Sequence, residues 1–154
     1  MPPKNKAEPG LHARALRFLA RREHSRLELA RKLARYTEDE SEIEHLLDEF
    51  ERKGWLSEQR VVEQVSAVRR RRFGARRIAH ELREKGISED AINAELPRLK
   101  GSELAAAREV WRKKFGALPT NARDKARQIR FLQGRGFDAD VIRRLLKSTA
   151  DENE

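Results

Sequence analysis

Residues 75–100 read ARRIAHELREKGISEDAINAELPRLK, and the spacing of the apolar residues in this stretch decides the fold. Four apolar positions follow one another at steps of three, ten and four residues: Ala79, Leu82, Ile92 and Leu96. Steps of three and four place side chains on the same face of an α-helix. Between the two pairs lie Gly86, a residue type that ends helices, and Ser88, a type that begins them. The stretch is therefore predicted to form two amphipathic helices joined by a short turn.

The same spacing occurs twice more in the chain. At an offset of 49 residues towards the N-terminus, the matching positions are Ala30, Leu33, Ile43 and Leu47. At an offset of 50 residues towards the C-terminus, they are Ile129, Leu132, Ile142 and Leu146. Similarity at a nearly fixed period indicates a repeat architecture.

Helix start and stop signals agree with this interpretation. Residues 25–28 and 41–44 are two capping boxes, in which Ser and Glu side chains bond the free amides of a helix start. Further candidate N-caps are Ser57, Ser88, Ser102 and Asp138. Candidate stop signals are Gly54, Gly74, Gly86, Gly116 and Gly136. No alternating apolar and polar run rich in β-branched residues indicates a strand.

The predicted fold is all-α: an elongated, curved array of three tandem three-helix, helix-turn-helix-like repeats. The predicted bounds are 11–56, 57–100 and 101–148, with disordered polar tails at 1–10 and 149–154. A three-helix unit is too small to bury a large core alone, so neighbouring repeats must stack. Stacked small units expose much surface, which accounts for a hydrophobic content of only 38%.

Composition excludes several classes of protein. The 154 residues contain no cysteine, so the chain has neither disulfides nor Cys-ligated metal sites. No run of about 18 apolar residues indicates a membrane span, and residues 1–6 lead into charged sequence without an apolar signal core. We therefore expect a cytoplasmic protein with no membrane partner. The 35 basic against 26 acidic residues favour an acidic partner such as nucleic acid.

The basic surplus is concentrated in the second and third repeats. Residues 58–154 carry a net charge of +8 and residues 1–57 carry +1. Four successive arginines on a helix would cover its circumference, so some must face solvent or a partner. Arginine suits bidentate contacts with phosphate, and basic ends at matching sites predict a stripe along the array. The candidate binding residues are Arg69, Arg70, Arg71, Arg72, Arg76, Arg77, Arg112, Lys113, Lys114, Arg123, Lys125, Arg127 and Arg130.

Other motifs carry no chemistry. The four histidines lack metal-ligand spacing, so we expect no metal site. Residues 134–139, GRGFDA, match a dinucleotide-binding pattern in letters but follow a helix instead of a strand. Both tryptophans, Trp55 and Trp111, are predicted to fill gaps between helices, although each type of ring can stack on bases. Without a cluster of catalytic groups, the sequence predicts no enzyme and no cofactor.

Two segments carry a resemblance to a known family. Residues 50–65, FERKGWLSEQRVVEQV, lead to the arginine run, and residues 77–87 read RIAHELREKGI. This order resembles the bacterial RecX regulatory proteins, from about Leu11 to Lys147. The third repeat matches more loosely.

The resemblance implies a non-enzymatic inhibitor of the recombinase RecA, acting in the regulation of DNA repair and the SOS response. It implies tandem three-helix repeats that lie in the groove of the RecA–single-stranded DNA filament and suppress filament growth, ATP hydrolysis and strand exchange. The expected partners are the RecA filament and single-stranded DNA, with non-specific binding of double-stranded DNA by a monomer. Two alternatives stay open: a non-specific nucleic-acid-binding module, and a structural adaptor whose arginines are only solvated.

Overall fold

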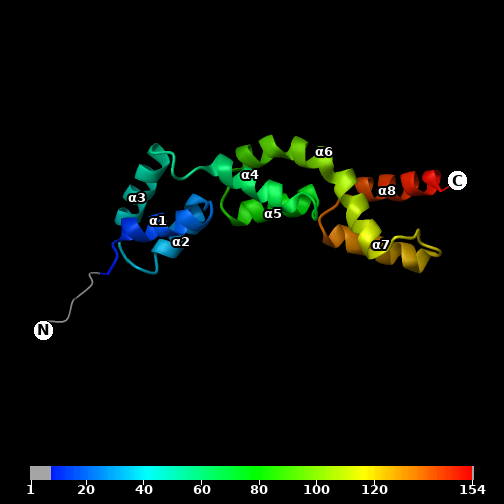
Figure 1. The fold of residues 1–154 in the computed structure, drawn as a ribbon, viewed down its shortest axis with the longest axis horizontal. Helices are drawn as coiled ribbons and strands as arrows, with labels where there is room; N and C mark the ends of the chain where they lie inside the picture. Colours follow the sequence, from blue (N-terminus) through cyan, green and yellow to red (C-terminus); the bar gives the residue numbers. More distant parts are fainter. Residues whose placement is uncertain (1–7, 154) are drawn as a thin grey trace, which may run out of the picture. The chain divides into compact units, whose positions relative to one another are not determined.

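The computed structural model describes residues 8–153, and every regular element within them is an α-helix (Figure 1). The chain divides into two compact units, Met1–Val61 and Val62–Glu154, with the division inside the fourth helix. The helices are α1 (Leu11–Arg21), α2 (Arg26–Leu33), α3 (Glu40–Arg52), α4 (Glu58–Arg69), α5 (Ala75–Glu84), α6 (Glu89–Lys114), α7 (Ala122–Gly134) and α8 (Ala139–Glu152). The all-α prediction is confirmed.

The first unit is the three-helix repeat that the sequence predicts. Helices α1 and α3 both pack against α2. The core contains Leu29, Leu33, Leu47 and Phe50, which are fully buried. Two of these, Leu33 and Leu47, are repeat positions, so the periodicity located the core correctly.

The start of α2 is the predicted capping box. The Ser25 hydroxyl accepts a bond from the Glu28 amide, and the Glu28 side chain accepts one from the Ser25 amide, each at 3.1 Å. The second predicted box is wrong, because Asp39 caps α3 instead of Ser41. Asp39 Oδ1 accepts bonds from the amides of Ser41 and Glu42. An Asp two residues earlier supplies the same acceptor, so the helix begins there.

Replacement of Ser25 by Ala should lower the free energy of unfolding of the first unit by about 1 kcal/mol, because the buried start of α2 loses its acceptor. Urea denaturation followed by circular dichroism measures the loss. The matched control is Ser41→Ala, because Ser41 does not cap α3 and is exposed. Equal losses in the two variants would contradict this role for Ser25.

In the second unit, the central element is α6, against which α5, α7 and α8 pack (Figure 1). This 26-residue helix runs through the predicted boundary between residues 100 and 101. It is both the third helix of the second repeat and the first helix of the third. The predicted N-cap at Ser102 is therefore wrong, since Ser102 lies within the helix and donates to the Leu99 carbonyl at 3.1 Å.

Tertiary burial explains why α6 continues past Pro97 and Gly101. Its buried residues recur at steps of three or four along the whole length, with one adjacent pair at 106 and 107: Ile92, Glu95, Leu99, Glu103, Ala106, Ala107 and Trp111. One continuous buried stripe favours one continuous helix, and this outweighs the local preferences of proline and glycine.

Helix α8 runs to Glu152, into the segment predicted as a tail from residue 149. The hydroxyls of Ser148 and Thr149 donate to the Leu145 carbonyl at 3.1 and 2.8 Å, so these polar residues are accommodated within the helix. At the other end, Gly10 is the N-cap of α1 and the Pro9 carbonyl accepts a bond from Arg14. The rest of the predicted N-terminal tail, residues 1–7, lies outside the described residues, as does Glu154.

Candidate nucleic-acid interface

The run of four arginines begins in α4 and continues into the turn that follows. Only Arg69 is helical, so the interpretation with all four on one helix is wrong. Beyond the end of α4 the Arg72 amide bonds the Arg69 carbonyl at 3.0 Å in a tighter turn, and the Gly74 amide then bonds the Arg135 carbonyl of the third repeat at 2.9 Å. All four arginines are exposed.

Two glycines place this turn against the turn between α7 and α8. A Cβ on Gly74 would overlap the Gly136 carbonyl, and a Cβ on Gly136 would overlap the Cβ of Arg77. Gly136 also has a φ of 88°, a conformation that only glycine adopts readily. The two turns therefore touch backbone to backbone, and this contact positions the arginines of the second repeat beside the third.

The result is a groove that joins the two predicted basic clusters. Arg70, Arg71 and Arg72 line one depression with Lys113 of α6. An adjoining depression shares most of these residues and extends to Lys114, Phe131 and Arg135. We call this surface the basic groove and define it by six cations: Arg70, Arg71, Arg72, Lys113, Lys114 and Arg135.

The basic groove holds little compensating charge. Among the described residues that line it, Glu109 is the only acid. Glu109 is engaged by Arg112 at 2.9 Å and by Lys113 at 3.5 Å, and the hydrogen bond from Arg112 lowers the pKa of its carboxyl. Within residues 8–153, no acid pairs with Arg70, Arg71 or Arg72. Three adjacent cations are thus available to an anion.

Arg135 is a member that the sequence interpretation missed. Its guanidinium carbon lies 5.4 Å from the Phe73 ring centroid and 5.2 Å from that of Phe131, so it bridges one ring from each repeat. The sequence interpretation treated residues 134–139 only as a glycine turn. An arginine between two glycines of a predicted turn was the available signal, but nothing in the sequence placed that turn beside Phe73.

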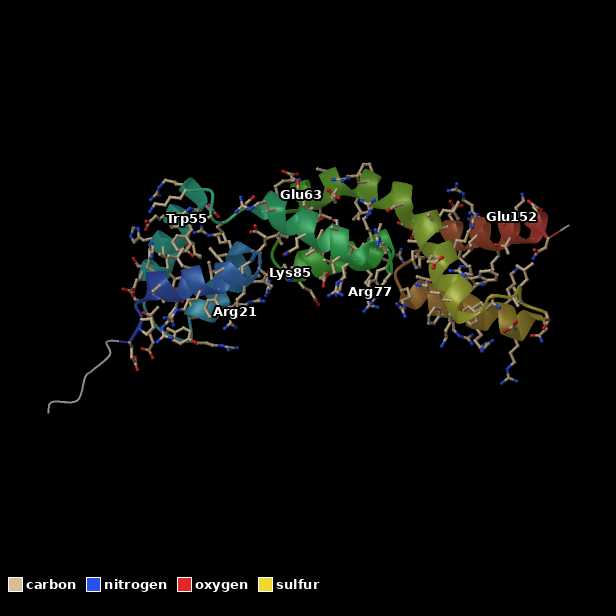
Figure 2. The ribbon with its side chains drawn as sticks, viewed as in Figure 1. Arg21, Trp55, Glu63, Arg77, Lys85 and Glu152 are labelled. Atoms are coloured by element: carbon tan, nitrogen blue, oxygen red, sulfur yellow. The ribbon has the colours of Figure 1, made fainter. Side chains whose placement is uncertain are left out.

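Half-buried phenylalanine rings alternate with cations on this part of the second unit. The guanidinium carbon of Arg77, a residue labelled in Figure 2, lies 4.2 Å from the Phe73 ring centroid. The Lys114 Nζ lies 5.4 Å from the ring centroid of Phe131. Phe131 meets Phe115 edge to face at 5.4 Å between centroids. Cations held against aromatic faces keep their charge while their orientation is restricted, which prepares them for an anionic partner.

The buried carboxylate of Glu103 links α6 to the start of α5. Glu103 of α6 is 2% exposed, and its Oε1 accepts a bond from the Ala75 amide, at the start of α5, at 3.2 Å. The pKa of the Glu103 carboxyl is raised, chiefly because burial penalises its charged form, while the backbone N–H groups of Ala75 and Asp138 oppose the shift. Ala75 and Asp138 lie at the starts of α5 and α8, where helix dipoles favour a negative charge.

Comparison with known proteins identifies the architecture. Family models of the first, second and third three-helix domains of RecX match residues 12–50, 57–96 and 102–146. The chain belongs to the RecX family. Each match lies within one of the three repeats that the periodicity indicates.

Full-length relatives agree with this membership. Regulatory protein RecX of Leptothrix cholodnii is 47% identical over 97% of this chain and 96% of its own length. The protein of the same name from Chromobacterium violaceum is 46% identical over 93% of each. A crystal structure of a regulatory protein RecX has the same fold, with a TM-score of 0.75 at 17% identity, covering 88% of this chain and 70% of that one. RecX from Lactobacillus salivarius gives 0.70 at 18% identity, covering 90% and 93%.

In the RecX family's terms, the basic groove joins the second and third domains, and the other predicted site residues do not line it. Arg69 pairs with Glu81 at 3.2 Å, and Arg77 donates to the Gly134 carbonyl at 3.3 Å. The remaining predicted residues are exposed and line neither depression of the basic groove: Arg76, Arg112, Arg123, Lys125, Arg127 and Arg130.

The two tryptophans of this RecX-family chain differ in environment. Trp111 is 5% exposed and donates its ring N–H to Gln128 Oε1 at 2.7 Å, so the prediction of core packing is confirmed. Trp55 is 41% exposed, and the same prediction is wrong for it. It rests edge-on against Phe50, with 5.2 Å between ring centroids, and leaves much of its ring on the surface of the first unit.

No group of three or more His, Cys, Asp or Glu residues in residues 8–153 is arranged to hold a metal ion. Across the same part of the chain, none of the helices is both long and apolar enough to span a membrane.

Proposed function

We propose that this RecX-family chain inhibits RecA by binding the RecA–single-stranded DNA filament through its basic groove. In this proposal the chain lies in the filament groove and suppresses filament growth, ATP hydrolysis and strand exchange. It acts without a catalytic group or cofactor, as a ligand of the filament.

The observation that carries the proposal is the meeting of Arg70, Arg71 and Arg72 with Lys113 and Lys114 around a single acid. Such a surface favours a polyanion, because bound counterions are released when phosphates replace them. Arginine adds bidentate geometry that lysine lacks. The family membership supports the choice of RecA, since the relatives carry the name regulatory protein RecX.

Tandem repeats suit a filament for a further reason. A filament presents the same surface at regular intervals, and several weak contacts on one chain act together because the first raises the effective concentration of the rest. The second and third repeats share α6 and the glycine contact, so their cations are presented together. Because these cations already lie together, little free energy is spent on ordering them when the chain binds the filament.

Reversal of three charges tests the proposal. A variant with Arg70→Glu, Arg71→Glu and Arg72→Glu should need about tenfold more protein for half-inhibition of RecA ATP hydrolysis on single-stranded DNA, because three phosphate or carboxylate contacts become repulsive. These exposed residues have no ion pair with any residue of 8–153, so the helical circular dichroism should not change.

The matched control carries the same change in net charge elsewhere. Arg17, Arg31 and Arg35 are exposed residues of the first repeat. Their joint replacement by Glu should leave inhibition within about twofold of the wild-type value, because these residues do not line the basic groove and exposed charges are screened. Equal effects of the two triple variants would reject the basic groove as the binding surface.

A second candidate function is a non-specific nucleic-acid-binding module. The observation in its favour is the alternation of cations with the rings of Phe73 and Phe131, since aromatic rings stack on unpaired bases. The two candidates differ in the need for DNA. Retention of the chain on immobilised RecA without DNA supports the RecA proposal, whereas retention only on DNA favours the module.

A further inference from the structure

A second groove lies along α8, away from the residues that define the basic groove. On α8 it is lined by Ala139, Ile142, Arg143, Leu146, Lys147 and Ala150. The opposite side is formed by Leu118 and by Lys125 and Ile129 of α7. We call this surface the α8 groove. It contains Lys125, which the sequence interpretation assigned to the basic stripe.

The spacing of the α8 residues is that of a helix face packed against another helix. The lining positions advance by three, one, three, one and three residues from Ala139 to Ala150, which makes one continuous stripe over three turns. At a rise of 1.5 Å per residue, the stripe is about 16 Å long. An occupant that matched it in full would be a helix of about three turns.

The third repeat has more exposed apolar surface here than the first. Ile129 occupies the position of Ala30 and Ala79, yet it is only half-buried. Leu146 is half-buried, whereas the matching Leu47 is completely buried. Large apolar side chains that are partly exposed to water are unfavourable. A patch of them is typical of a surface that another molecule covers.

Charge indicates which kind of molecule fits. Three cations line the α8 groove, and no acidic residue does among the described residues that form it. Arg143 pairs with Asp140 at 3.2 Å. Lys125 and Lys147 have no acidic partner within residues 8–153. An apolar floor between unpaired lysines complements a helix with an apolar stripe and acidic flanks.

We propose that the α8 groove binds an acidic amphipathic helix of a partner protein. Leu118, Ile129 and Leu146 receive the apolar stripe, and Lys125 and Lys147 pair with carboxylates on its two sides. This site shares no residue with the basic groove. Its loss and the loss of RecA inhibition through the basic groove are therefore separate results.

A pair of designed peptides tests the proposal on the full chain. One peptide has about three helical turns, an apolar stripe of leucines and glutamate flanks; the other carries lysine in place of every glutamate. Fluorescence anisotropy of each labelled peptide should show saturable binding of the acidic form and at least about tenfold weaker binding of the basic form. Equal affinity of the two peptides would overturn the assignment of an acidic partner.

Variants locate the binding site. Lys147→Glu should weaken the acidic peptide about tenfold, whereas Arg144→Glu, a neighbouring exposed residue outside the groove, should change it by less than about twofold. Ile129→Ala should also weaken binding about tenfold, because it removes apolar surface from the groove. We expect this variant to fold, because Ala30 and Ala79 occupy the matching positions of the other two repeats. Equal effects of Lys147→Glu and Arg144→Glu would refute the site.

The alternative occupant is a second copy of the chain. Sedimentation at increasing concentration should show no dimer whose formation depends on Lys147 and Ile129. A dimer abolished by these two substitutions would replace the partner helix with self-association and overturn the proposal.

Discussion

Gly136→Ala is expected to destabilise the unit Val62–Glu154 by about 3 kcal/mol or more. Two effects combine at this position. An alanine at a φ of 88° is strained by about 1–2 kcal/mol. Its Cβ also overlaps the Cβ and amide nitrogen of Arg77, and overpacking of this kind costs about 1–3 kcal/mol. Urea denaturation followed through buried Trp111, in a Trp55→Phe background, measures the loss.

Two other glycines separate these effects. Gly74 has a φ of −79°, so Gly74→Ala introduces only the overlap, against the Gly136 carbonyl. Gly54 has a φ of 73° and open space around it, so Gly54→Ala introduces only the strain, about 1 kcal/mol, into the first unit. Circular dichroism follows the Gly54 variant.

The ranking of the three variants decides whether the glycine contact matters. The largest loss should come from Gly136→Ala and the smallest from Gly54→Ala. If Gly136→Ala is no worse than Gly54→Ala, the close backbone contact between the second and third repeats is not required. The basic groove would then need another explanation for its arrangement.

Glu103→Ala is the second substitution with a large expected effect, about 2–4 kcal/mol of lost stability in the same unit. It leaves the buried Ala75 amide without an acceptor and opens a cavity beneath the glycine contact. Glu103→Gln is the matched control, because its amide oxygen can still accept the bond. At neutral pH it should stay within about 1 kcal/mol of wild type.

The raised pKa of Glu103 makes stability depend on pH in a defined direction. The folded state holds the proton more tightly than the unfolded state, so stability falls as pH rises from the ordinary carboxyl value of 4.5 through the raised folded value. Glu103→Gln removes this contribution. The free energy of unfolding of Glu103→Gln relative to wild type should therefore rise as the pH increases above the ordinary carboxyl value of 4.5.

The negative charge of the Asp138 carboxylate raises the pKa of Glu103, and the positive charge of Lys100 lowers it. In a Lys100→Met variant, stability should keep falling to higher pH than in wild type, because loss of this cation raises the pKa of Glu103 further. A Glu103→Gln difference that is flat over the same pH range would show that burial does not raise this pKa.

Local spacing was sufficient to predict the repeats. The steps from Ala79 to Leu96, copied at 49 and 50 residues, located core residues such as Leu33, Leu82 and Leu132, all of which are fully buried. Helical periodicity depends only on residues three and four apart, so it is visible in the sequence itself. The same is true of the Ser25 capping box, which involves residues within one turn.

Helix boundaries between repeats were less predictable. Pro97, Gly101 and Ser102 indicate a break by their own preferences, yet α6 passes through all three. What keeps the helix intact is burial on both sides of the boundary, at Leu99 and at Glu103, and burial depends on helices far along the chain.

The binding surfaces show the same division. The sequence by itself determined that the second and third repeats carry the positive charge, because charge is a property of composition. Only the tertiary structure decided that Arg72 and Lys113 share one groove with Arg135, while Lys125 belongs to another. The physical reason is the contact of Gly74 with Gly136: residues 62 positions apart approach closely only because neither has a side chain, and no local pattern records that pairing.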